Sequence, residues 1–113
     1  MSSPTPGRPV RGSRSGRPIM ALLDLLGRRM ALRILWELAI APGELTFREL
    51  QRAAETNPSV LNARLKELRA ARLVERGREG YALSSMGREL LATFLPLNQW
   101  AKAWAQRIAG GSS

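Results

Sequence analysis

Apolar residues recur with helical spacing over most of the chain. Pro18 suits the first turn of a helix, and the apolar positions after it lie three and four residues apart until Gly27, which is expected to end the helix. A second run with the same period extends from Met30 to Leu38 and stops before a Pro-Gly pair, which cannot continue a helix. The pattern therefore predicts two helices before the first loop.

Two further helices are predicted to meet across a tight turn. Thr46 and Glu49 have the spacing of a capping box, in which the hydroxyl accepts from the third helical N–H and the carboxylate accepts from the N–H of the cap residue. Asn57 can cap the next helix, and Pro58 can occupy its first position because proline lacks the N–H that is unpaired there. A short helix therefore precedes a helix that runs from Pro58 to Ala71.

The helix from Pro58 to Ala71 is predicted to be amphipathic. Leu61, Leu65 and Leu68 share one face, so this face is expected to pack on the core. The opposite face is polar, and its side chains are small near the start of the helix. Its residues are Ser59, Asn62, Ala63 and Lys66.

The remaining pattern predicts a hairpin and a long last helix. Residues 73–76 and 81–84 have the composition of two short strands around a glycine turn. Ser84 or Ser85 can cap a helix that runs to about Ala109, but Pro96 lies inside it. Because proline removes a helical hydrogen bond and clashes with the carbonyl four residues earlier, we expect either a kink or a break into two helices there.

The order of these elements is that of a winged helix-turn-helix, a mainly α fold with a small β-hairpin. One such domain is expected over residues 18–109. Residues 1–17 are rich in Ser, Pro, Gly and Arg, carry four arginines and no acid, and are expected to form a flexible basic arm. This arm either inserts arginine side chains into a minor groove or serves as a solubilising tail.

Composition limits the classes of function that the chain can have. The chain has 18 Lys and Arg against 9 Asp and Glu, and this net charge of +9 favours an anionic partner, although a solvated basic surface is the alternative. It has no Cys and no His, and no pair of carboxylates is expected in a common cleft. We therefore expect no enzyme, no metal site and no cofactor. No signal peptide or membrane span is indicated, so the expected location is the cytoplasm, at the nucleoid through DNA binding.

Four segments carry a family resemblance: "PIMALLDLLGRRMALRILWEL", "LTFRELQRA", "VLNARLKELRAARLVER" and "YALSSMGRELL", in this order. Together, over about residues 17–104, they resemble the HxlR-type winged-helix regulators of bacteria, which are relatives of the MarR type. The resemblance implies a homodimer that binds double-stranded DNA and is joined largely through its first and last helices. It implies a transcriptional repressor or activator, and we expect repression.

The resemblance also implies a DNA-binding surface. Ser59, Asn62 and Arg64 match DNA-facing positions at the start of the family's recognition helix, and the charged residues further along this helix are either contacts or its solvated face. Two arginines beside the hairpin turn are candidates for phosphate contacts, or are ordinary hairpin charges. The predicted DNA-binding residues are Thr46, Asn57, Ser59, Asn62, Ala63, Arg64, Lys66, Arg69, Arg76 and Arg78.

Apolar positions near both ends of the chain indicate an interface between two copies. Trp100 and Trp104 are four residues apart on one helical face, and a monomer would leave that stripe in water. Trp36 and Trp100 can alternatively line a pocket for a small hydrophobic effector. The predicted dimer interface consists of Ile19, Leu22, Leu23, Leu26, Leu97, Trp100 and Trp104.

The sequence departs from the family pattern in three places. Arg17 stands where many members have a Cys that senses oxidants or electrophiles, which excludes thiol sensing here. Met30 stands where an aromatic residue is common. The wing from Arg76 to Tyr81 is shorter than usual, so Arg78 is the main candidate for a contact at its tip.

The expected function is the binding of a pseudo-palindromic operator, and two other functions are alternatives to it. A winged helix can serve as a protein-interaction module, with its basic charge incidental. The small polar start of the recognition helix argues against that role, because a docking helix more often carries aromatic or aliphatic anchors. RNA binding has less support, since no aromatic side chains are expected on an exposed sheet.

Overall fold

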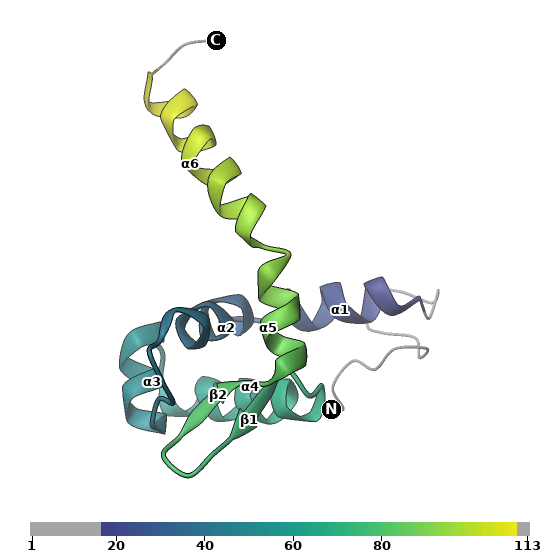
Figure 1. The fold of residues 1–113 in the computed structure, drawn as a ribbon, viewed down its shortest axis with the longest axis vertical. Coiled ribbons are helices and arrows are strands. Elements are labelled where there is room, and N and C mark those ends of the chain that lie inside the picture. Colours follow the sequence, from purple (N-terminus) through teal and green to yellow (C-terminus); the bar gives the residue numbers. More distant parts are fainter. Residues whose placement is uncertain (1–16, 111–113) are drawn as a thin grey trace.

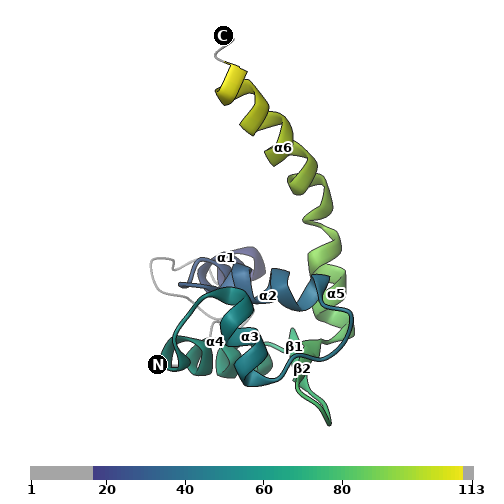
Figure 2. The same ribbon diagram turned by 90° about the vertical axis from the view of Figure 1, so that its left-hand side faces the viewer.

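The computed structural model describes residues 17–110, which form six helices and one antiparallel hairpin (Figures 1 and 2). Of the predicted basic arm, residues 1–16 lie outside this part, and Arg17 is the N-cap of the first helix. The elements are α1 (Pro18–Leu26), α2 (Ala31–Ile40), α3 (Phe47–Ala54), α4 (Pro58–Ala70), β1 (Val74–Arg76), β2 (Tyr81–Leu83), α5 (Ser85–Ala92) and α6 (Leu95–Gly110). Their order confirms the predicted winged helix-turn-helix.

The predicted helix caps are present. The Thr46 hydroxyl accepts a hydrogen bond from the Glu49 N–H at 3.1 Å, and the Glu49 carboxylate accepts one from the Thr46 N–H at 2.9 Å. At the start of α4, the Asn57 side chain accepts from the Val60 N–H at 2.8 Å. These bonds satisfy N–H groups that have no partner inside the helix, and so fix where α3 and α4 begin.

The last helical segment is interrupted near Pro96. It therefore forms two helices rather than one kinked helix. Pro96 would clash with the carbonyl of Ala92, and α5 ends at that residue. In α6, Pro96 is the second residue, where its missing N–H costs no hydrogen bond. In the turn, the Thr93 hydroxyl donates to the Leu90 carbonyl at 2.6 Å.

The hairpin forms the wing and has one contact that the sequence pattern did not predict. β1 and β2 pair in antiparallel register, with Val74 opposite Leu83 and Arg76 opposite Tyr81. Leu45 and Tyr81 also exchange two backbone hydrogen bonds of 3.0 and 2.7 Å, which join the loop before α3 to β2. A bridge one residue long carries no alternating pattern, so it has no signal in the sequence.

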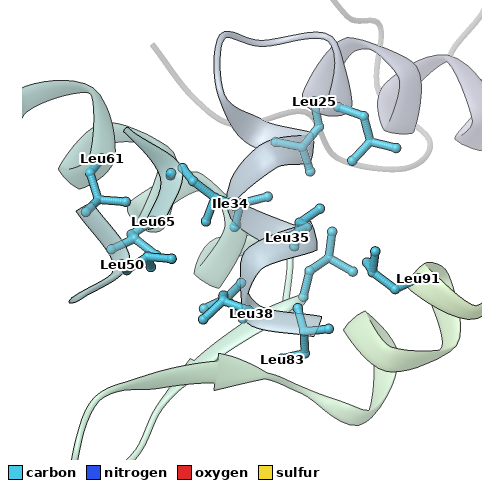
Figure 3. Packing of buried hydrophobic residues seen from close by; sticks show 14 residues of the cluster. Leu25, Ile34, Leu35, Leu38, Leu50, Leu61, Leu65, Leu83 and Leu91 are labelled. Atoms are coloured by element: carbon cyan, nitrogen blue, oxygen red, sulfur yellow. The ribbon is translucent and has the colours of Figure 1, made fainter. Parts of the chain in front are cut away.

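The core surrounds α2. Figure 3 shows Ile34 on the side of Leu61 and Leu50, whereas Leu35 lies toward Leu91 of α5. The predicted inner face of α4 is confirmed, since its three leucines are buried there. None of the residues of α6 is buried, and this helix projects from the body at the end opposite α4 and the wing (Figures 1 and 2).

Candidate nucleic-acid interface

The outer edge of α4 is uncovered. Ser59 and Asn62 are exposed in the first two turns, and Ala63 beside them is half-buried. The buried leucines on the opposite face anchor the helix, so the small polar side chains point away from the core. An edge of this kind can enter a major groove, where side-chain donors and acceptors meet base edges.

Two of the residues predicted to bind DNA act as helix caps. Thr46 and Asn57 are both exposed, but each already uses its side-chain oxygen to accept from a helical N–H. The Thr46 hydroxyl still has a proton to donate, and the Asn57 amide still has two. Both can therefore donate to a phosphate without losing the cap, and their role in DNA binding stays a prediction.

Four cations line a hollow between the second half of α4 and the wing. Lys66 and Arg69 come from α4, Arg72 from the turn that follows it, and Arg76 from β1. The hollow has a volume of about 690 Å³ and also contains Glu75. Converging cations favour a phosphate backbone over a neutral partner.

Arg72 belongs to the charges that the sequence offered either as contacts or as the solvated face of the helix, but it was not in the predicted set of DNA-binding residues. It follows α4 and adopts a left-handed conformation with φ of 62°, which starts the turn into β1. Arg72 therefore joins the lining of this basic hollow through the path of the backbone. The helical pattern of the preceding residues gave no signal for that placement.

The wing is held by the loop before α3. The Glu44 carboxylate accepts a hydrogen bond of 2.7 Å from the Glu79 N–H in the hairpin turn. Arg76 lies 5.6 Å from the centre of the Tyr81 ring, a cation–π distance. Arg78 is exposed at the tip, as predicted. The sequence pattern gave no indication of this anchoring role of Glu44, which comes from the fold.

Arg64 lies on the flank of α4 rather than on its outer edge. Only 19% of its side chain is exposed, and its Nε lies 3.4 Å from a carboxylate oxygen of Glu67. The second Glu67 oxygen lies 2.8 Å from Arg28, in the turn between α1 and α2. Arg64 is therefore placed differently from Lys66 and Arg69, which are exposed.

The predicted dimer interface divides into exposed and buried residues. Leu26 is only 7% exposed and belongs to the core, so it was wrongly placed in the interface. It turns inward because α1 packs on α2 at this end, and Leu22 is also partly buried against the core. The other predicted interface residues are exposed: Ile19, Leu23, Leu97, Trp100 and Trp104.

Trp36 lines a hollow of about 370 Å³ where α2 meets α5 and the start of α6. Phe94 and Leu97 are among its other lining residues, and Trp100 is not one of them. Arg33 at the same hollow hydrogen-bonds Glu37 at 2.9 Å, which raises the pKa of its guanidinium. The hollow is thus apolar with one cationic edge.

Metal-ligand clusters and membrane-spanning helices are both absent from residues 17–110. This part of the chain contains no group of three or more carboxylates or other donors that could hold a metal ion. Within the same residues, none of the helices is both long and apolar enough to cross a bilayer.

The fold and the exposed edge of α4 define a winged helix-turn-helix protein. The sequence model of the MarR family matches residues 24–81. The chain therefore belongs to the MarR family, a family of transcriptional regulators.

Solved structures agree with this assignment. Quinone-bound YodB from B. subtilis is 30% identical, over 75% of this chain and 96% of that one, with a TM-score of 0.67. A possible HxlR family transcriptional factor from Thermoplasma volcanium is 25% identical over 75% of this chain and 82% of the other, also with a TM-score of 0.67. The reduced form of the transcriptional regulator YodB shares the fold, with a TM-score of 0.60. None of the curated protein sequences compared with the chain matches it.

Proposed function

We propose that the chain is an HxlR-type repressor that binds a pseudo-palindromic duplex operator as a homodimer and acts in the cytoplasm. The uncovered polar edge of α4 carries this proposal, because Ser59 and Asn62 are exposed on a helix anchored by buried leucines. Half-sites about one or two helical turns apart would give each recognition helix its own major groove on one side of the duplex.

Selection of bound fragments from random duplex DNA tests the proposal. We expect an inverted repeat with this spacing, and binding that weakens steeply with salt because cations displace counterions from the phosphates. A protein-interaction module is the alternative, and selection that recovers no common sequence would favour it. The exposed polar residues at the start of α4 favour DNA, since a docking helix usually presents large apolar anchors there.

Substitutions on α4 separate base contacts from phosphate contacts. Ser59→Ala with Asn62→Ala should weaken operator binding by roughly tenfold to a hundredfold, and binding to unrelated DNA should change little. Lys66→Ala should weaken both kinds of binding and lower the salt slope by about one. Lys102→Ala is the control, because Lys102 is exposed on α6, far from α4.

Exposed apolar residues on α1 and α6 support the homodimer. Trp100 and Trp104 are 60% and 53% exposed, and their rings are stacked with centroids 6.0 Å apart. A stacked tryptophan pair on a projecting helix is costly to leave in water and suits burial against a second copy. Sedimentation velocity at micromolar concentration should show a dimer, and a monomer would refute this part of the proposal.

A small hydrophobic effector is proposed for the hollow at Trp36. Its apolar lining supports an aromatic or aliphatic ligand, and a quinone is bound to the similar protein YodB. The chain has no Cys, so such a ligand would bind without a thiol adduct. Release of operator DNA by small aromatic compounds should be lost when Phe94→Ala removes one side of the hollow. Release that continues unchanged in this variant would exclude the site.

A further inference from the structure

A network of charged side chains ties α4 to the turn between α1 and α2. Arg28 lies 2.8 Å from one oxygen of Glu67 and also hydrogen-bonds Asp24 of α1 at 3.2 Å. The other oxygen of Glu67 lies 3.4 Å from the Nε of Arg64, one turn earlier on α4. One carboxylate therefore stands between two guanidinium groups from different parts of the fold.

Glu67 and Arg64 form an ion pair without a hydrogen bond between the two facing atoms. The Nε of Arg64 and the facing Oε1 of Glu67 are both buried, and neither makes a hydrogen bond to any residue that the structure describes. Buried polar atoms without a hydrogen bond lower stability, so such an arrangement calls for an explanation. Stability alone does not provide one, because an apolar pair at these positions would avoid the cost.

The position of Arg64 provides an explanation. Arg64 lies two residues after Asn62 on α4, and about a fifth of its side chain is in contact with solvent. Its Nε lies 3.4 Å from Glu67, and its terminal nitrogens make no hydrogen bond or ion pair with the residues that the structure describes, so they are available to a ligand. A guanidinium restricted by an ion pair loses less side-chain entropy when it binds a phosphate than an unpaired one does.

We propose that Glu67 is a positioning residue for DNA binding: held by Arg28, it orients the Arg64 guanidinium on the flank of α4 for a backbone phosphate. The inference rests on the proposed DNA-binding function. The proposal predicts the opposite of what net charge alone predicts. By net charge alone, removal of a carboxylate from a DNA-binding face strengthens DNA binding. If Glu67 positions Arg64, its neutralisation weakens binding although the protein becomes more positive.

Glu75 supplies the matched control. It is exposed on β1, it lines the basic hollow, and it makes no ion pair with the part of the chain that the structure describes. Glu75→Gln should therefore strengthen DNA binding, by up to about threefold, through its charge alone. Glu67→Gln makes the same change of charge, so a difference in sign between the two variants isolates the positioning effect.

The test measures operator affinity of the full chain in a double-mutant cycle. Glu67→Gln should weaken binding about tenfold, as expected for a misplaced charge-assisted contact. In an Arg64→Gln background the same change should no longer weaken binding, because there is no guanidinium left to orient. If Glu67→Gln instead strengthens binding as Glu75→Gln does, in both backgrounds, the proposal is overturned.

A second variant keeps the test decisive if Glu67→Gln does not fold, as judged by circular dichroism. Arg64→Lys keeps the charge but has no Nε for Glu67 to orient, so it should lose nearly as much affinity as Arg64→Gln. Affinity equal to that of the wild type would overturn the proposal. Failure of the wild-type chain to bind any duplex would instead overturn the proposed function, so the two failures are distinguishable.

Discussion

Replacement of Gly80 by alanine should destabilise the wing. A Cβ on Gly80 would overlap the Leu45 carbonyl oxygen and would lie 2.8 Å from the Thr46 nitrogen. Both neighbours are backbone atoms, so no side chain can rotate away and the strand must shift. The shift would break the two backbone hydrogen bonds of 2.7 and 3.0 Å between Leu45 and Tyr81. At about 1 kcal/mol each, plus residual overlap, the free energy of unfolding should fall by roughly 2–3 kcal/mol.

Two other glycines make the experiment a graded series. No atom lies within 4 Å of a Cβ built on Gly43, so Gly43→Ala should be neutral or should stabilise by up to about 1 kcal/mol through the unfolded chain. A Cβ on Gly77 meets the Glu44 carboxylate, which can rotate away but then loses its bond to the Glu79 N–H. Gly77→Ala should therefore cost about 1 kcal/mol.

Urea unfolding followed by circular dichroism, at one fixed protein concentration for all variants, measures these differences. The expected order of stability is Gly43→Ala, then Gly77→Ala, then Gly80→Ala. If Gly80→Ala were as stable as Gly43→Ala, the close packing of β2 on the loop before α3 would be refuted. Operator affinity should follow the same order, because the hairpin presents Arg78.

Three further outcomes are expected. Thr46→Ala should lower the free energy of unfolding by about 1 kcal/mol, because it removes the cap of α3. A thermal melt beside Arg48→Ala, at an exposed position of the same helix, measures this, and equal melting temperatures would contradict it. Leu61→Ala should lower the free energy of unfolding by roughly 2–5 kcal/mol, measured by urea unfolding, since Leu61 is fully buried. A loss below about 1 kcal/mol would contradict the packing of α4 on the core through Leu61. Trp104→Ala should raise the dissociation constant of the dimer at least about tenfold in sedimentation, whereas Lys102→Ala should not; equal values would remove α6 from the interface.

The boundaries of the helices were predictable because local chemistry sets them. Thr46 and Asn57 accept hydrogen bonds from backbone N–H groups of their own helices, and Pro58 has no N–H to satisfy. These effects do not depend on what packs around the residues. The inner face of α4 was predictable for a similar reason, since the spacing of its leucines puts them on one side of any helix. The pattern also predicted the order of helices and hairpin, and the resemblance to a family then added the expected homodimer and the expected DNA-facing positions.

The incorrect and missing predictions concern neighbours that are distant in the sequence. Leu26 has the same helical spacing as Ile19 and Leu23, but it packs in the core because the end of α1 lies against α2, and the other two are exposed. The choice at Pro96 between a kinked helix and a broken helix also depends on distant neighbours. Contacts between the body and the segment after Pro96 would hold the direction of that segment, and none of the residues of α6 is buried.

By itself the sequence determined the class of fold, the caps and the polar edge of α4, because each depends on side chains and backbone groups within a few residues. Only the tertiary structure decided that Glu44 holds the wing and that Glu67 stands between Arg28 and Arg64. Those contacts depend on the directions in which helices pack, and the period of one helix carries no information about what lies opposite it.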